Sequence, residues 1–202
     1  MLQNFFKTFL LVSTALSMAV IGCTPDNTMG PGLPVHYIHA SEKLVIPAAI
    51  GIPANEPNGN TRVATFFADG VQKYKARPVA GSDPAVYEWA LVAPQAYLFD
   101  ARNKKVGTHT AGPTWQLYGG MDSIYAQHFT PARTTPSPDG SIDWLLLMPK
   151  AGKTPTGIFA DVSYIQRIAT RGGKAPATAP LKATDTVDVD YTAIYRFTKK
   201  NP

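Results

Sequence analysis

Apolar and polar residues alternate most clearly near the carboxyl end of the chain, between residues 187 and 198. Successive side chains of a strand point to opposite sides, so the two series fall on opposite faces of an extended chain. Ile194 is the exception in the polar series. The pattern predicts a strand with Val187, Val189, Tyr191, Ala193, Tyr195 and Phe197 on its apolar face and Asp188, Asp190, Thr192, Arg196 and Thr198 on its polar face.

Two segments upstream also have the pattern of strands. Residues 144–148 form a continuous apolar run, which is typical of a strand buried on both faces. Residues 162–168 alternate, so that Tyr164 and Gln166 share one face while Arg167 lies on the other. Any one pocket therefore receives Gln166 or Arg167, but not both.

The rest of the chain predicts short strands separated by loops. Apolar runs occur around residues 63–67, 71–74, 87–89, 96–100 and 106–109, and residues 102–104 have the composition of a hairpin turn between the last two. Segments rich in Pro, Gly and Asn predict loops at 53–60, 130–140 and 171–186. No amphipathic helix of ten or more residues stands out. We expect an all-β fold, a single compact antiparallel β-sandwich or barrel-like domain of about nine to twelve strands.

The amino terminus has the pattern of an export signal. An apolar stretch follows Lys7, and Val20-Ile21-Gly22-Cys23 matches a lipobox, with the only cysteine of the chain at its end. The alternative is a plain secretory signal followed by a chance cysteine. We expect residues 1–22 to be removed and Cys23 to carry the lipid that anchors the protein in the membrane. Thr24, rather than aspartate, favours the outer membrane.

Composition then sets the domain organisation and limits the partners. Residues 23–42 are rich in Pro and Gly and predict a tether, and residues 43–202 are long enough for one domain with its own core. The formal net charge of +5 is spread along the chain, which together with export argues against nucleic acid as a partner. With Cys23 lipidated no thiol remains, and we expect neither a metal nor a cofactor.

Several phrases are more specific than composition explains. In chain order they are Gly70-Val71-Gln72-Lys73-Tyr74, Val106-Gly107-Thr108-His109-Thr110-Ala111-Gly112-Pro113-Thr114-Trp115, Trp144-Leu145-Leu146-Leu147, Tyr164-Ile165-Gln166-Arg167, Gly172-Gly173-Lys174-Ala175-Pro176-Ala177-Thr178 and Tyr191-Thr192-Ala193-Ile194-Tyr195-Arg196-Phe197. Together they resemble the family DUF3455, over about residues 43–198. The resemblance implies an extracytoplasmic β-rich domain and brings no catalytic residues. Many members also carry two cysteines, where Ala76 and the neighbourhood of Pro180 stand here, which implies that this chain lacks their disulfide.

The shared phrases contain the candidate site residues. One interpretation makes the phrase from His109 to Trp115 a strand–turn–strand corner, with Gly112-Pro113 as the turn and Trp115 filling the core. The other interpretation places a shallow site for a small molecule or glycan among these phrases, since aromatic platforms with a few polar groups suit such ligands. Its residues would be Gln72, His109, Trp115, Tyr164 and Arg167.

Three functions are compatible with this sequence. The first is a lipid-anchored envelope protein that binds a ligand or partner. The second is an extracytoplasmic enzyme acting on carbohydrate or ester substrates, with His109 as a general base because imidazole titrates near neutrality. The third is a structural envelope protein without a ligand. Metal ligation by His109 with His128 is a weaker alternative.

The lipid anchor is tested by replacing its attachment site. We expect Cys23→Ser to abolish metabolic labelling with palmitate and to release the domain from the membrane fraction, because no other residue can accept the lipid. Labelling of the Cys23→Ser protein at the level of the parent would contradict the anchor.

Overall fold

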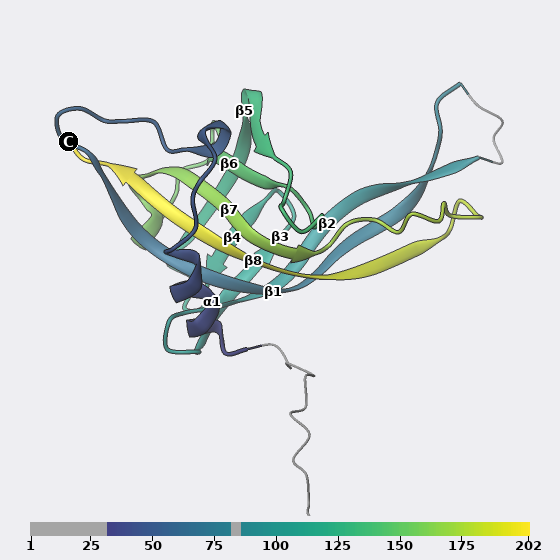
Figure 1. Ribbon diagram of the computed structural model, residues 1–202, viewed down its shortest axis with the longest axis horizontal. Helices are drawn as coiled ribbons and strands as arrows, with labels where there is room; N and C mark the ends of the chain where they lie inside the picture. The colour runs from purple at the N-terminus through teal and green to yellow at the C-terminus, as the bar shows by residue number, and fades with distance from the viewer. Residues whose placement is uncertain (1–31, 82–85) are drawn as a thin grey trace, which may run out of the picture. The chain divides into compact units, whose positions relative to one another are not determined.

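The strands form a closed antiparallel ring in which each strand pairs with the next and the last returns to the first (Figure 1). The structure is a computed structural model that describes residues 32–81 and 86–202. Its strands are β1 (Asn60–Pro78), β2 (Tyr87–Phe99), β3 (Lys105–Thr110), β4 (Thr114–Leu117), β5 (Ser123–Thr135), β6 (Trp144–Pro149), β7 (Val162–Gly172) and β8 (Thr186–Lys200). The short helices are α1 (Pro34–Ser41), η1 (Ala48–Ile50) and η2 (Gly157–Phe159).

The all-β class is confirmed, and of the two expected architectures the structure has the barrel. The expected nine to twelve strands are wrong, since the described residues form eight. Separate apolar runs turned out to belong to single long strands, because β1 continues through Gly70 and β2 continues through Pro94. Part of the expected loop 130–140 is also strand, with Pro131 at an irregularity where pairing between β5 and β6 skips several residues.

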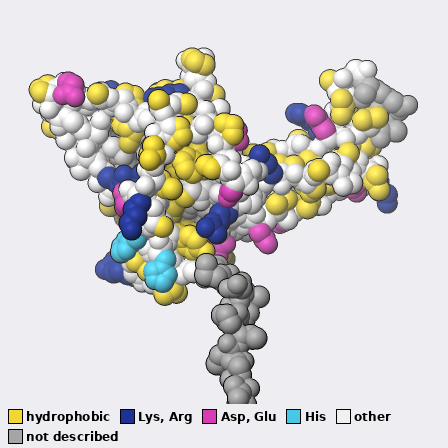
Figure 2. Space-filling view, in the orientation of Figure 1, with side chains coloured by type: hydrophobic (Ala, Val, Ile, Leu, Met, Phe, Trp, Pro, Cys, Tyr) yellow, Lys and Arg dark blue, Asp and Glu magenta, His cyan; other side chains and the backbone are white. Residues whose placement is uncertain are grey.

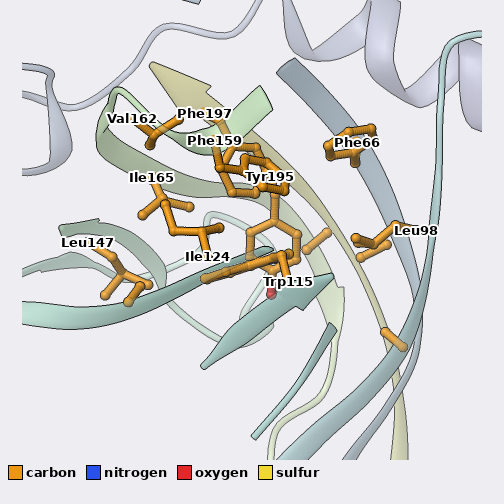
Figure 3. Packing of buried hydrophobic residues seen from close by; sticks show 14 of the residues in the cluster. Phe66, Leu98, Trp115, Ile124, Leu147, Phe159, Val162, Ile165, Tyr195 and Phe197 are labelled. Carbon is orange, nitrogen blue, oxygen red and sulfur yellow. The ribbon is translucent and has the colours of Figure 1, made fainter. Parts of the chain in front are cut away.

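One face of every strand contributes to the barrel interior. The interior is packed with aromatic rings, among which Phe197 contacts Phe66, Trp115 and Phe159 (Figure 3). The apolar face predicted for β8 is confirmed from Tyr191 onward. The buried members of this cluster are Phe66, Ala68, Ala96, Leu98, Trp115, Ile124, Ala126, Ile142, Leu147, Phe159, Val162, Ile165, Tyr191, Ala193, Tyr195 and Phe197.

A second apolar cluster covers the outer face of the barrel over β1, β6, β7 and β8. Ile38 of α1 and Ile50 of η1 pack there against strand residues that include Leu146, Ile168 and Ile194. This explains why Ile194 interrupts the polar series of β8. It also explains why residues 144–148 are apolar throughout, because their two faces enter the two clusters.

Buried polar contacts attach the amino-terminal segment to the strands. Gln166 Nε2 donates to the Ile50 carbonyl at 2.9 Å, and Arg196 Nη2 donates to the Ser41 carbonyl at 2.7 Å. Glu42 pairs with Arg196 at 3.4 Å and also with Arg62. Burial lowers the pKa of the Arg196 guanidinium, with Arg62 adding to this effect and Glu42 opposing it.

These contacts correct one expectation. Residues 34–42 were expected to belong to a tether, but α1 forms there and packs on the barrel. Because this segment covers the outer face of the sheet, Arg196 and Thr198 on the polar face of β8 are each only 4% exposed.

Two glycines allow close approach of neighbouring strands. A Cβ atom built on Gly70 would lie 2.2 Å from the Gln95 carbonyl oxygen of β2. One built on Gly107 would lie 2.3 Å from the Gln116 carbonyl oxygen of β4. Real Cβ atoms do not come this close to backbone atoms, so these positions of the shared phrases require glycine.

The segment that precedes β8 passes beside Ala76. The Ala76 amide donates to the Asp185 carbonyl at 2.8 Å, and Trp89, the β2 partner of Ala76, donates through its indole to the Thr178 carbonyl at 2.9 Å. Pro180, between Thr178 and Asp185, is buried. The two positions for which the resemblance implies cysteines, Ala76 and the neighbourhood of Pro180, therefore lie in neighbouring segments of this fold.

Charges of both signs are interspersed on the face of the molecule drawn in Figure 2. Among residues 32–81 and 86–202, no helix has the length and apolar character needed to cross a membrane. The expected signal and Cys23 lie outside the described residues, so the lipid anchor remains a prediction.

Gly107→Ala tests the close approach of β3 and β4. We expect it to lower the free energy of unfolding by about 2–3 kcal/mol, because the added methyl group forces the paired backbones apart. Urea denaturation followed by circular dichroism measures the effect. Gly51→Ala is the matched control, since its Cβ would meet only ordinary contacts, the nearest at 3.4 Å. Equal stability of the two variants would contradict the steric argument.

Candidate functional site

A cavity of about 520 Å³ opens at one end of the barrel interior. His109, Trp115 and Tyr195 form its inner wall, and their side chains belong to or contact the interior cluster. The β3–β4 turn at residues 111–113 contributes to the rim. The other lining residues are Gln72, Leu91, Val92, Ala93, Pro94, His128, Ile142, Asp143, Leu145, Leu147, Arg167 and Lys174.

The phrase from His109 to Trp115 is a β-hairpin whose two flanking side chains stack. His109 pairs with Trp115 across the ladder, and their rings lie 4.4 Å apart at an interplanar angle of 10°. Gly112 turns the chain at a φ of 123°, and Thr114 Oγ1 donates to the Ala111 carbonyl at 2.8 Å. The expected strand–turn–strand corner is therefore present, Trp115 is fully buried as predicted, and the same corner forms one wall of the cavity.

His109 is held in one neutral form. Its Nδ1 lies 2.9 Å from the Thr114 carbonyl oxygen, and because a carbonyl only accepts, Nδ1 carries the proton. The pKa of His109 is lowered to about 3, mainly by burial and also by the Arg167 guanidinium, while the Thr114 contact opposes the shift. An imidazole with this pKa is a weak base near neutral pH. The arrangement therefore orients His109 as a packing partner of Trp115 and gives it little capacity for proton abstraction.

Two of the residues that line the cavity carry a buried donor for which residues 32–81 and 86–202 provide no hydrogen-bond partner. The donors are Gln72 Nε2 and Trp115 Nε1, and the two side chains are 2% and 0% exposed. The hydroxyls of Tyr191 and Tyr195 also have no partner of good geometry among the described residues, although each tyrosine affects the pKa of the other and Arg167 affects both. Burial raises the pKa of both tyrosines, so both hydroxyls keep their protons. An unpaired buried donor costs about 1–3 kcal/mol of stability. A ligand that supplied acceptors to these donors would therefore be stabilised at this end of the barrel.

Arg167 is the half-buried cation of the site. Its Nε and Nη2 donate to the Asp143 carbonyl at 3.0 and 2.8 Å, which fixes the plane of the guanidinium beside the cavity. Gln166 points to the opposite side of β7 and bonds the Ile50 carbonyl. The expectation that only one of these two neighbours enters the pocket is thus confirmed.

Tyr164 does not share the site, which corrects one candidate residue. It lies in the outer cluster, where its ring stacks on Phe129 at 6.4 Å. The alternation of residues 162–168 already placed Tyr164 and Arg167 on opposite faces, so the pattern itself argued against grouping them. Gln72, His109, Trp115 and Arg167 do line one cavity.

Sequence reasoning missed three residues that complete the wall. Tyr195 had a usable signal, because it belongs to the apolar series of β8 that fills the interior. Asp143 and Lys174 lie beside strands in connecting segments, and no periodic pattern marks them. Gly172 and Gly173, with φ of 67° and 82°, turn the chain after β7 and so place Lys174 at the rim.

His109 and His128 line the same cavity, as a metal site would require. Within residues 32–81 and 86–202, however, no three His, Cys, Asp or Glu side chains gather in an arrangement that could hold a metal ion.

The buried, neutral His109 makes a prediction about acid stability. The unfolded chain takes up a proton on this side chain below pH 6.5, whereas the folded protein does not until about pH 3. Above pH 6.5 the imidazole is neutral in both states, and the free energy of unfolding keeps its full value. As the pH falls from 6.5 toward 3, only the unfolded chain binds the proton, and the free energy of unfolding decreases. By pH 4.5 the free energy of unfolding should drop about 3 kcal/mol further in the parent than in His109→Gln.

Urea titrations of both proteins at pH 7 and pH 4.5 measure this difference. The comparison with His109→Gln removes the contribution of carboxylates that titrate over the same range. Parallel pH profiles for the two proteins would contradict the neutral, buried state of His109.

The chain was compared with known proteins. Residues 57–199 match the model of a family described as "Protein of unknown function (DUF3455)". The match includes all eight strands of the barrel apart from the last residue of β8, and it begins after α1 and η1. No curated protein and no solved structure matches the chain. Because the match extends over well more than half of the chain, this protein belongs to the DUF3455 family.

Proposed function

We propose that this protein is a lipid-anchored cell-envelope protein whose barrel binds a small organic ligand without transforming it. The ligand occupies the cavity formed by the β3–β4 hairpin, Gln72 and Arg167. The observation that carries the proposal is the pair of unpartnered buried donors, Gln72 Nε2 and Trp115 Nε1, on the wall of a cavity of about 520 Å³.

The size and lining of the cavity support binding of a small molecule. Sites for such ligands are typically concave, with volumes of roughly 300–1,000 Å³, and combine apolar walls with a few placed polar groups. Here Leu145, Leu147 and Ile142 form apolar wall, and Arg167 and Gln72 provide the polar groups. Acceptors on a bound ligand would satisfy the unpaired donors of Gln72 and Trp115, which supports binding over a purely structural role.

The geometry gives less support to an enzyme that uses His109. A general base needs a pKa near the working pH and a partner that orients it for proton transfer. The pKa of His109 is lowered to about 3, and its Nδ1 hydrogen bond goes to the Thr114 backbone carbonyl rather than to a carboxylate. We therefore assign His109 to the wall of a binding site.

Envelope attachment is the second half of the proposal and rests on the lipobox sequence Val20-Ile21-Gly22-Cys23. Residues between Cys23 and α1 link the anchor to the barrel. The protein would then present its ligand site at a membrane surface.

A fragment screen tests the binding site. The full-length protein is screened by saturation-transfer difference NMR, and the hits are repeated with Val92→Trp. Val92 lines the cavity and is 53% exposed, so a larger side chain narrows the entrance without entering the packed interior. We expect most hits to lose at least about 80% of their signal, in keeping with a ligand that is largely enclosed.

Met121→Trp is the matched control, because Met121 is 76% exposed and does not line the cavity. It should leave the hits unchanged. If no fragment binds, or if Val92→Trp and Met121→Trp behave alike, the proposed site is refuted.

A further inference from the structure

We infer that the ligand is a small organic acid, whose anionic group binds Arg167 and whose apolar body lies against Leu145 and Leu147. This inference rests on the proposed function and adds the chemical class of the ligand. It follows from three properties of the cavity, namely an unpaired cation, a wall that offers donors, and aromatic rings whose faces are covered.

The first property is the charge of Arg167. Its guanidinium has five N–H groups, of which one at Nε and one at Nη2 bond the Asp143 carbonyl. Within residues 32–81 and 86–202 the ion pairs involve other cations, namely Arg62, Lys73, Arg77, Arg102 and Arg196. Arg167 is therefore a positioned, half-buried charge without a carboxylate partner, and burying such a charge is costly unless an anion joins it.

The surrounding charges leave an excess of cations. Lys174 adds a second positive charge at the rim, whereas Asp143 is the one carboxylate among the lining residues. Its side chain forms no ion pair with Arg167, although its carbonyl orients the guanidinium. The field of Arg167 reaches the inner wall, where burial first and the guanidinium second lower the pKa of His109. A carboxylate bound here would meet a net positive environment.

The second property is the direction of the available hydrogen bonds. An indole N–H can only donate, and Trp115 Nε1 has no acceptor. Gln72 Nε2 is also an unpartnered donor. A carboxylate supplies acceptors and no donors, so its chemistry matches that of the guanidinium and of these two donors. Charge-assisted bonds of this kind are stronger than those between neutral groups.

The third property argues against a neutral sugar. Sugars bind against open aromatic faces. The indole of Trp115 is instead stacked by His109 at a ring distance of 4.4 Å. The same indole also contacts Tyr195 and Phe197 at ring distances of 5.0 and 5.6 Å. Tyr164, the other expected platform, lies in the outer cluster. The accessible wall is aliphatic instead, with Leu91, Val92, Pro94, Ile142, Leu145 and Leu147. This favours a ligand with an apolar body.

A matched pair of probes isolates the charge. The full-length protein is titrated by calorimetry with 2-naphthoate, with the neutral 2-naphthamide of nearly the same shape, and with cellobiose as a neutral sugar. We expect 2-naphthoate to bind at least about tenfold more tightly than 2-naphthamide, because one charge-assisted contact contributes a difference of this order. Both should be lost in Val92→Trp.

Substitutions then test which residues cause the preference for 2-naphthoate over 2-naphthamide. Arg167→Gln should remove the preference for 2-naphthoate, and Arg167→Lys should restore part of it. Asp143→Asn should strengthen 2-naphthoate binding, since it removes the opposing carboxylate and keeps the carbonyl that orients Arg167. Arg171→Gln is the matched control, because Arg171 lies on the same strand outside the cavity, near Tyr37. It lowers the net charge equally but should leave the preference intact.

The outcomes separate this inference from the proposed function. If the naphthyl probes bind in the cavity equally well, or if Arg167→Gln keeps the preference, the acid is refuted and the binding site stands. If cellobiose binds in the cavity and 2-naphthoate does not, the ligand is a sugar and the inference is wrong. If no probe is sensitive to Val92→Trp, the binding site itself fails.

Discussion

The fully buried indole of Trp115 is the element on which the interior of this barrel depends. On one side it packs against Phe197 and the aromatic cluster, and on the other it stacks with His109 at the wall of the cavity. An eight-stranded barrel has just enough interior for side chains to fill it or for one small ligand. Here the two uses are combined, because aromatic side chains fill one part and the remainder, beyond Trp115, stays open as a cavity.

This division explains the unusual polar groups at the open end. In the part of the chain that the structure describes, the donors of Trp115 and Gln72 have no acceptor, and Arg167 is in no ion pair with a carboxylate. In a packed core such groups would lower stability, and here their residues line one cavity. The same burial that leaves the donors unpaired also holds His109 neutral, so the wall carries its positive charge at Arg167 rather than at the imidazole.

The outer face of the barrel is completed by chain that lies outside the family match. α1 and η1 cover a cluster that includes Trp144, Leu146 and Ile168, and the contacts of Arg196 and Gln166 hold them there. Strands that are apolar on both faces need such a cover, because one face fills the barrel and the other would be exposed to water. The amino-terminal segment is therefore part of the folded domain from α1 onward.

The sequence by itself determined the strand class, the alternation of β8, the hairpin turns and the family, because these depend on local periodicity and on residues such as Gly112 that a turn requires. It also separated Gln166 from Arg167, since side-chain direction alternates along any strand. Only the tertiary structure decided that the ring closes, that helix α1 covers Arg196, and that Gln72, Trp115 and Arg167 meet at one cavity while Tyr164 does not. These features depend on pairing between residues far apart in the chain, such as β1 with β8. Local sequence patterns do not predict such pairing.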